Sequence, residues 1–296
     1  MKLEGLHILL TYQCTCECDH CFVWGSPWQT GTLTFDQIER ILEQAKEAGV
    51  ESIYFEGGEP FLYYAILLQA VRKAANMGFS VGIVTNAYWA NSVADAEEWL
   101  RPFAGRLADL TVSSDLFHCS ESMGERPQNA LVAAKWLNIP TGMISIAQPD
   151  ADAKQTQGQI EDEGAVMYRG RAAANLSSRA TGHPWQGFDS CPHEDLREPG
   201  RIHLDPFGNL HICQGIAIGN LFEKPLKQIC EEYDAEAHPI CGPLLGGGPA
   251  ALVSEYNVPH SSHYADACHL CYEVRKTLRS RFPRELCPDQ MYGVLE

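Results

Sequence analysis

Short apolar runs alternate with amphipathic stretches along the first 175 residues of the chain. Residues 6–10 are almost all apolar, which is typical of a strand buried in a parallel sheet. After Thr34, apolar residues recur every three or four positions until Gly49, so this stretch predicts a helix with one buried face. Thr34 and Gln37 have the spacing of a capping box, which favours a helix start at this point.

The alternation continues further along the chain. Further strands are expected at residues 52–55, 80–84, 107–112, 141–146 and 166–168, and further helices at residues 67–77, 95–103 and 128–137. The polar stretch 150–163 is expected to form a surface loop and helix. Repeated strand–helix–strand units predict a parallel sheet. About six units are too few for a complete eight-unit barrel, which needs roughly 200 residues or more, so we expect an α/β fold with a partial (β/α)6 TIM-like barrel.

The pattern changes after residue 175. Residues 175–200 are polar and rich in glycine and proline, which indicates a domain junction. The apolar segments 201–204 and 209–212 flank a turn sequence and predict a hairpin. We therefore expect a barrel domain at residues 1–180 and a small C-terminal α+β domain at residues 181–296.

Two further features mark the C-terminal part. Leu270, Val274 and Leu278 are spaced as the buried face of a helix. The run of three glycines and a proline at residues 246–249 predicts a flexible loop.

Charge excludes several classes of partner. The 296 residues include 22 Lys and Arg against 38 Asp and Glu, for a net charge of −16. Such a surface repels phosphate, so we expect no nucleic-acid partner and no docking on anionic membranes. No stretch approaches the roughly 20 apolar residues of a membrane span, and the N-terminus lacks a signal-peptide pattern. These features predict a cytoplasmic protein.

Twelve cysteines are too many for chance core filling and too few for a small disulfide scaffold. In a reducing compartment, clustered cysteines indicate metal or redox chemistry. They form an early group and a late group, with one cysteine between them. The early group is Cys14, Cys16, Cys18 and Cys21, the late group is Cys191, Cys213, Cys230, Cys241, Cys268, Cys271 and Cys287, and Cys119 lies between.

The early group follows the first predicted strand, at the end where barrels place their active sites. Cys14, Cys18 and Cys21 can hold three irons of a [4Fe–4S] cluster and leave the fourth iron open for another ligand. A closed zinc site, completed by Cys16 or His20, is the alternative. The ligand types favour the cluster over zinc.

The second predicted strand ends in Gly57, Gly58, Glu59 and Pro60. Glycines at this position allow the backbone to approach a ligand closely. The neighbouring carboxylate of Glu59 could bind an ammonium group. The two motifs lie at adjacent strand ends, so together they predict one binding site.

At these motifs the chain resembles the radical S-adenosylmethionine (SAM) superfamily over about residues 5–175. The matching residues are Cys14, Cys18 and Cys21, His20 at the usual aromatic position of the family, and Gly57, Gly58, Glu59 and Pro60. Weaker matches follow the later strands, at Thr85 and Asn86, at Ser113 and Asp115, and at Gly170 and Arg171.

The resemblance implies a catalytic [4Fe–4S] cluster whose open iron binds the amino and carboxylate groups of SAM. Gly57, Gly58 and Glu59 would hold the methionine moiety, with Glu59 facing its ammonium group. Thr85, Asn86 and Ser113 are candidates for contacts with the carboxylate and ribose. An electron donor such as flavodoxin or ferredoxin would reduce the cluster, and cleavage of SAM would give a 5′-deoxyadenosyl radical that removes a substrate hydrogen.

Four late cysteines could form a second centre, either structural zinc or a second [4Fe–4S] cluster. They are Cys191, Cys213, Cys268 and Cys271. Their arrangement is similar to the twitch domain of radical SAM dehydrogenases and is related to the longer SPASM domain, which favours one auxiliary iron–sulfur cluster. Cys287 competes for a ligand position, because its spacing from Cys271 resembles that of molybdopterin-precursor cyclases. The chain lacks the glycine-rich tail of those cyclases.

Other polar and sulfur-containing residues have ordinary interpretations. Cys16, Cys119, Cys230 and Cys241 are expected to be small packing or loop residues. A solvated loop position is expected for His118, with a substrate contact or proton relay as the alternative. Asp115 and Arg171 are expected either to contact ligands or to form structural salt bridges.

These observations predict a radical SAM enzyme with one catalytic and one auxiliary cluster, acting on a small molecule or a peptide. Since the first strand begins by Leu6, no separate peptide-recognition domain is expected before it, which favours a small molecule or a free peptide. A non-catalytic zinc or iron–sulfur protein for electron transfer is the alternative from another class. The glycine-rich turn at residues 57–60 argues against a carrier.

Overall fold

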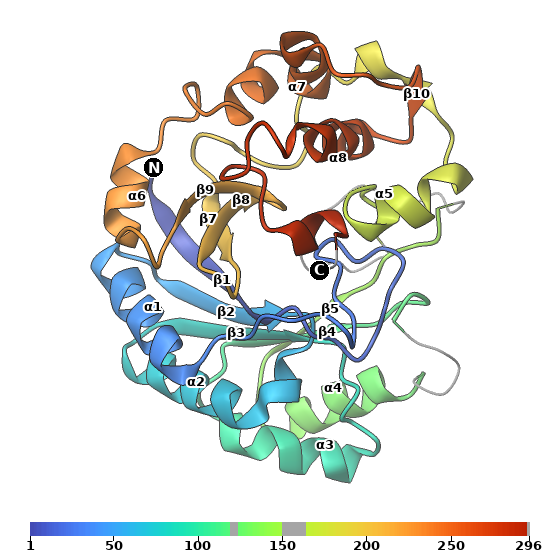
Figure 1. Ribbon diagram of the computed structural model, residues 1–296. Helices are drawn as coiled ribbons and strands as arrows, with labels where there is room; N and C mark the ends of the chain where they lie inside the picture. Colours follow the sequence, from blue (N-terminus) through green and yellow to red (C-terminus); the bar gives the residue numbers. More distant parts are fainter. Residues whose placement is uncertain (119–123, 150–163, 295–296) are drawn as a thin grey trace.

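The computed structural model describes residues 1–118, 124–149 and 164–294, whose helices and strands are shown in Figure 1. Cys119 and the polar stretch 150–163 lie outside the described residues. The first half of the chain follows the predicted alternation. Its strands are β1 (Leu3–Thr11), β2 (Ser52–Gly57), β3 (Ser80–Thr85), β4 (Asp109–Ser113) and β5 (Thr141–Ile144), and its helices are α1 (Phe35–Glu47), α2 (Tyr64–Asn76), α3 (Val93–Leu100) and α4 (Arg126–Trp136).

Local sequence explains how these elements form. The Thr34 side chain accepts a hydrogen bond from the Gln37 backbone N–H, and the Gln37 side chain accepts one from the Thr34 N–H. This confirms the predicted capping box at the start of α1. In β1, Leu6 and Ile8 belong to the apolar core shared with the helices, so the side chain of His7 points to the other face of the sheet.

Eight strands form one sheet in the order β5-β4-β3-β2-β1-β7-β8-β9. β1 to β5 pair in parallel, which gives the predicted α/β architecture. β7 (Gly200–Leu204) pairs in parallel with the other edge of β1, and β8 (Asn209–Cys213) and β9 (Ile216–Asn220) extend the sheet in antiparallel fashion. β7 and β8 are the predicted hairpin, and through β7 the sheet continues into the C-terminal part of the chain.

The strand expected at residues 166–168 is not formed. Near this position, the described residues contribute only an isolated parallel bridge between Ile146 and Gly164. Val166 and Tyr168 instead pack in a small apolar cluster with Ala172 of α5 (Arg171–Asn175). Their apolar character therefore reflects packing on a helix rather than pairing in the sheet.

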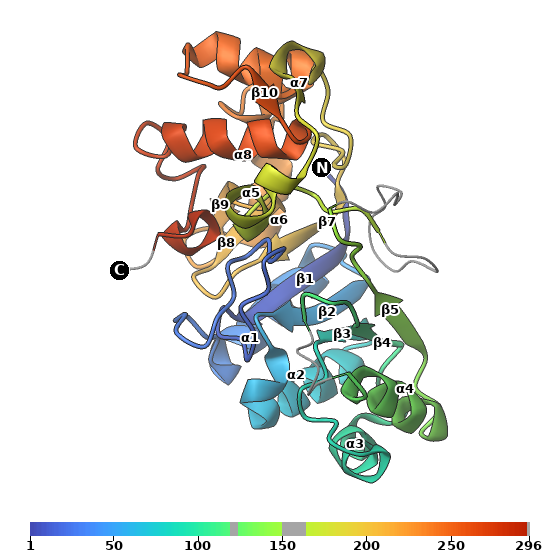
Figure 2. The ribbon, with the colours of Figure 1, turned by 90° about the vertical axis from the view of Figure 1, so that its right-hand side faces the viewer.

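The C-terminal part adds α7 (Cys241–Tyr256), α8 (Ala267–Leu278), β6 (His183–Pro184) and β10 (His263–Tyr264) on the side of the sheet away from α1 to α4 (Figures 1 and 2). α6 (Leu226–Glu232) instead lies beside α1, and its Leu226 and Ile229 join the core beneath the helices. Short 3₁₀ helices lie at Pro60–Tyr63, Arg101–Phe103, Ser177–Arg179, Trp185–Gly187 and Asp289–Tyr292. The loop predicted at residues 246–249 is a kink within α7, where Gly247 and Gly248 leave helical geometry.

Two apolar cores hold the molecule together. The first lies between the sheet and α1 to α4. The second joins α7 and α8 to residues from the N-terminal part, including Leu9, Tyr12 and Val23. The segment that follows β1 is therefore packed against the C-terminal elements. In the part of the chain that the structure describes, no helix is long and apolar enough to cross a membrane.

Candidate active site and metal centres

The segment between β1 and α1 carries the first group of cysteines. The Cys14 N–H donates to the Ser26 carbonyl at 3.0 Å, which folds the segment back on itself. The Sγ atom of Cys14 accepts from the Cys16 N–H at 3.4 Å, and that of Cys21 accepts from the Gly25 N–H at 3.2 Å. Hydrogen bonds to cysteine sulfur tune iron–sulfur clusters, so this loop fits a cluster-binding role.

The thiols of this group lie close together. Hydrogen bonding to Cys16, together with burial, raises the pKa of the Cys14 and Cys18 thiols, and Cys21 acts electrostatically on Cys18. The thiolate is the form that binds metal, so a cationic centre is needed to stabilise it here. The structure also places the Cys16 sulfur beside those of Cys14 and Cys18, as the alternative zinc site would require.

Arg171 ties this cysteine loop to the start of α5. Its guanidinium donates to the carbonyls of Cys18 at 2.9 Å and Gly25 at 2.8 Å, and its N–H donates to the Cys21 carbonyl at 2.9 Å. Gly170 has a φ of +60°, and a Cβ there would lie 2.6 Å from the Cys21 carbonyl oxygen. Among the described residues, Arg171 forms no ion pair, so the predicted salt bridge is not observed, and its contact with a ligand stays a prediction. It is a buried residue that positions the loop.

Gly57 and Gly58 bring the end of β2 against the end of β1. The Gly58 N–H donates to the Thr11 carbonyl at 2.7 Å. A Cβ on Gly57 would lie 2.4 Å from the Thr11 carbonyl oxygen, and one on Gly58 would lie 2.1 Å from that of Gln13. Contact with the backbone that leads to Cys14 therefore requires both glycines.

The carboxylate of Glu59 joins the ends of β2 and β3. Its Oε1 accepts from the Phe61 N–H at 3.0 Å and from Thr85 Oγ1 at 2.9 Å, and its Oε2 accepts from the Asn86 N–H at 2.8 Å. The side chain is fully buried, and burial raises the pKa of Glu59 to about 7. The observed roles of Glu59 and Thr85 are to connect two strand ends, and their contacts with SAM stay predictions.

Asn86 links β3 to the cysteine loop. Its Nδ2 donates to Thr15 Oγ1 at 3.0 Å and lies 3.6 Å from the Sγ atoms of Cys14 and Cys16. Ser113, at the end of β4, is buried. Asn86 is thus a predicted SAM-binding residue that directly contacts the cysteine group.

A buried carboxylate lies between two histidines just after β4. Asp115 Oδ1 lies 2.8 Å from His118 Nδ1, and Oδ2 lies 3.2 Å from His20 Nε2. Although burial raises the pKa of Asp115, hydrogen bonds and attraction from His118 and His20 lower it overall. The solvated position predicted for His118 is wrong, because its side chain is only 15% exposed and is fixed by Asp115. For Asp115, the structure shows contacts with two histidines, which become the predicted salt bridge only when a histidine is protonated.

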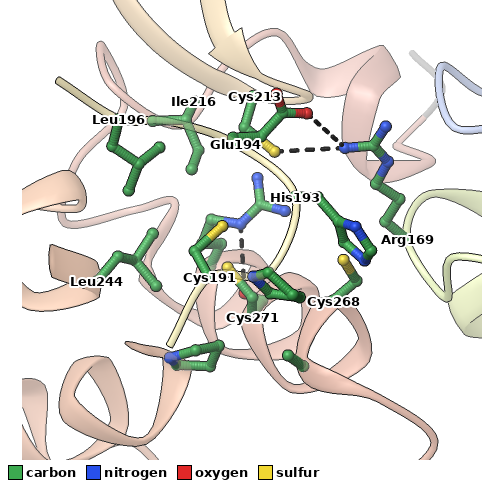
Figure 3. A pocket seen from close by; sticks show the side chains of 14 residues that line it. Arg169, Cys191, His193, Glu194, Leu196, Cys213, Ile216, Leu244, Cys268 and Cys271 are labelled. Atoms are coloured by element: carbon green, nitrogen blue, oxygen red, sulfur yellow. Dashed lines mark hydrogen bonds and ion pairs between the residues drawn. The ribbon is translucent and has the colours of Figure 1, made fainter. Parts of the chain in front are cut away.

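The four late cysteines singled out by their spacing line one pocket (Figure 3). Cys191 precedes β7, Cys213 ends β8, and Cys268 and Cys271 lie three residues apart on α8. Burial raises the pKa of the Cys213 thiol to about 11. Cys287 does not line this pocket, and its Sγ lies 3.2 Å from the carbonyl oxygen of Arg284.

Two arginines that the sequence did not single out border this pocket, the largely buried Arg169 and the fully buried Arg275. Arg169 Nη1 lies 3.5 Å from Cys213 Sγ and 3.4 Å from Glu194 Oε1. Arg275 donates from Nε to the Cys271 carbonyl at 3.3 Å. Positive charge favours the thiolate, so the pocket fits a metal centre with several cysteine ligands. One signal could have identified Arg275, namely its position one helical turn after Cys271.

Phe22 connects the two groups of cysteines. It follows Cys21 directly, and the Arg169 guanidinium lies 5.4 Å from the centre of its ring. Arg169 also contacts Cys213, so two side chains join the early group to the late one. Cys230 and Cys241 are buried in the apolar cores, as predicted for packing residues.

Sequence comparison identifies relatives of this chain. Residues 8–115 match the profile of the Radical SAM superfamily. The putative peptide biosynthesis protein YydG of Bacillus subtilis (strain 168) is 23% identical over 259 residues, which cover 87% of this chain and 75% of YydG. A probable GTP 3′,8-cyclase of Saccharolobus islandicus (strain M.14.25 / Kamchatka #1) is 33% identical over 87 residues, but these cover only 29% of this chain and 28% of the cyclase.

Solved structures share the fold. Streptococcus suis SuiB bound to the precursor peptide SuiA has a TM-score of 0.56 at 14% identity, with 90% of this chain and 76% of SuiB covered. Histidine-tagged anSMEcpe with bound AdoMet has a TM-score of 0.54 at 13% identity, with 99% of each chain covered. Together with the cysteine loop after β1 and the glycines after β2, the profile match shows that residues 8–115 of this chain form a Radical SAM superfamily domain.

Proposed function

We propose that this chain is a peptide-modifying radical SAM enzyme with a catalytic and an auxiliary iron–sulfur cluster. One observation carries the proposal. Cys191, Cys213, Cys268 and Cys271 come from separate segments, line one pocket, and are joined to the early cysteine loop by two side chains. This arrangement supports two communicating metal centres.

The early centre uses Cys14, Cys18 and Cys21 as ligands. The cluster and SAM, when bound, supply one-electron chemistry that cleaves SAM and lets a hydrogen atom be removed from the substrate. Arg171 fixes the loop through its carbonyls, and Asn86 donates toward the cysteine sulfur. Cys14 is 9% exposed and Cys18 is 7% exposed, so the loop limits the access of water to the ligands.

Binding of SAM is assigned to the ends of β2, β3 and β4. Gly57, Gly58 and Glu59 would contact its methionine moiety, and Thr85, Asn86 and Ser113 its carboxylate and ribose. All six lie at the strand ends next to the cysteine loop, and Asn86 contacts that loop directly.

The late centre is assigned to an auxiliary [4Fe–4S] cluster, with zinc as the alternative metal. Its role would be to accept an electron from the substrate or to bind the substrate directly. The cationic Arg169 and Arg275 favour a centre of net negative charge, which four thiolates give with either a cluster or a zinc ion.

A peptide is the proposed substrate. YydG, which aligns over most of this chain, is described as a putative peptide biosynthesis protein, and SuiB has been crystallised with a precursor peptide. BtrN, of similar fold at a TM-score of 0.50, is in complex with AdoMet and 2-DOIA, which keeps a small molecule as the second candidate. We place the protein in the cytoplasm, since its described cysteines form no disulfide bonds. Flavodoxin or ferredoxin is the proposed electron donor.

Metal analysis and SAM cleavage under anaerobic conditions test the two centres. Two [4Fe–4S] clusters correspond to about eight iron and eight sulfide ions per chain. We expect 5′-deoxyadenosine when dithionite and SAM are added. Cys18→Ala should abolish its release. Cys268→Ala should keep it but lose about half of the iron. Cys287→Ala is the matched control and should retain both the release of 5′-deoxyadenosine and the full iron content. Zinc in the purified protein, without sulfide, would contradict the proposal.

Isotope transfer tests the substrate. Deuterated synthetic peptides, encoded by short open reading frames that adjoin the gene, are incubated with the reconstituted enzyme and SAM. Transfer of deuterium into 5′-deoxyadenosine from one peptide supports a peptide substrate. Transfer only from a deuterated extract of small metabolites would support the second candidate.

A further inference from the structure

Three titratable side chains from neighbouring strands meet on the face of the sheet opposite α1 to α4. They are His7 of β1, Glu56 of β2 and His203 of β7, and their side chains are between 14% and 18% exposed. Their strand neighbours Ile8 and Phe55 point into the core beneath the helices. Since side chains alternate along a strand, the three polar groups face the interior side that carries the cysteine loop.

Glu56 directs one oxygen at each histidine. Oε2 lies 3.5 Å from His7 Nδ1, and Oε1 lies 3.1 Å from His203 Nε2. One nitrogen from each ring and one carboxylate oxygen all lie within 4.8 Å of one another. Oε1 is buried, and its polar neighbour is His203 Nε2, at 3.1 Å. A buried oxygen without a hydrogen bond is costly unless a ligand satisfies it.

Strand pairing fixes these side chains in place. His7 lies opposite His203 in the β1–β7 register and opposite Tyr54 in the β1–β2 register. The His7 ring stacks on Tyr54 at 4.8 Å and meets the His203 ring edge-on at 5.1 Å. Sites built on packed strands keep their geometry better than sites on loops, so this cluster is preorganised.

Two imidazoles and one carboxylate are a donor set for divalent transition metals. In a tetrahedral zinc site, ligand atoms about 2.0–2.1 Å from the ion are about 3.4 Å apart. The two distances from Glu56 to the histidines lie on either side of that value.

We propose that His7, Glu56 and His203 bind one divalent metal ion of the zinc type, separate from both groups of cysteines. Three protein ligands leave a further coordination position for water or for a substrate oxygen or nitrogen. The Phe22 ring, next to Cys21, lies 6.1 Å from the His203 ring, which places the site beside the space between the two cysteine groups. The proposal depends on these three side chains and not on SAM chemistry, although its test uses enzyme whose cysteines are occupied by the clusters of the proposed function.

Zinc binding to the reconstituted enzyme tests the site, because the iron–sulfur clusters then occupy the competing cysteines. After removal of loose metal with a chelator, we expect about one bound zinc per chain at one added equivalent. X-ray absorption at the zinc edge should show nitrogen and oxygen at about 2.0–2.1 Å rather than sulfur at about 2.3 Å. His203→Phe should weaken zinc binding at least about 100-fold, more than the loss of an outer-shell partner does.

His260→Phe, at an exposed histidine, is the matched control and should bind zinc as the unmodified enzyme does. Glu56→Gln keeps the shape of the side chain and should also lose zinc, so it replaces His203→Phe if that variant does not fold. Three outcomes would overturn the proposal. The enzyme binds no zinc, the bound zinc is coordinated by sulfur, or the folded Glu56→Gln enzyme binds zinc as the unmodified enzyme does. SAM cleavage is not a readout, so failure here is distinct from failure of the proposed function.

Discussion

At the residue scale, one buried guanidinium holds the early cysteine loop. Arg171→Gln removes two hydrogen bonds to the carbonyls of Cys18 and Gly25. Bonds from charged donors contribute about 1.5–3 kcal/mol each, so we expect the folded state to lose about 3–6 kcal/mol and the enzyme to lose the iron of its first cluster. Arg106→Gln is the control, since that exposed arginine also donates to backbone carbonyls. Iron content and melting temperature measure both effects, and full iron in Arg171→Gln would contradict the assigned role.

Glu59 gives the protein a specific pH dependence. Its pKa is raised from 4.5 to about 7 in the folded state because the carboxyl is buried. Its contribution to stability is therefore fully present below about pH 4.5 and is lost as the pH rises through 7. Glu59→Gln removes this titration, so we expect the variant to gain stability relative to the unmodified protein between about pH 5 and pH 7. Urea unfolding at both pH values measures the free energy of unfolding of the variant and of the unmodified protein. The prediction is refuted if the difference between the two proteins is the same at both pH values.

At the element scale, the kink in α7 positions the segment that leads to Cys191. Gly248 has a φ of +60°, and a Cβ there would lie 2.2 Å from the Ser190 backbone nitrogen. We expect Gly248→Ala to displace Cys191, and so to lose the iron of the auxiliary cluster, about half of the total, while 5′-deoxyadenosine is still formed. Gly246→Ala, whose Cβ meets nothing within 4 Å, should keep all of its iron. Equal iron in the two variants would argue against Cys191 as a ligand.

The pattern of apolar residues predicted most elements of the first half, including the start of α1 at its Thr34 cap. Several elements of the second half were missed, and α7 and β9 show the physical reasons. α7 contains a glycine run that has little intrinsic helical preference, and packing against neighbouring segments stabilises it. β9 has apolar residues but no alternation, so only its pairing with β8 identifies it.

At the scale of the whole molecule, β7 protects the edge of β1. Removal of residues 181–296 would expose the backbone groups on that edge and take Ile202, Leu204 and Leu210 out of the first core. We expect a fragment of residues 1–180 to aggregate or to lack a cooperative thermal transition. Gel filtration measures the aggregation and circular dichroism the thermal transition, with the full chain as control in both. A monomeric fragment with a cooperative transition would instead support an independent barrel domain at the predicted boundary.

By itself, the sequence determined what depends on neighbours along the chain. The spacing of Cys14, Cys18 and Cys21, the glycines after β2 and the cap of α1 are local patterns, so they could be recognised without coordinates. The tertiary structure decided what depends on distant segments. It brought His203 of β7 beside His7 of β1 and placed Arg169 between Phe22 and Cys213. Such contacts follow from strand order and from packing between segments far apart in the chain, and no local pattern encodes them.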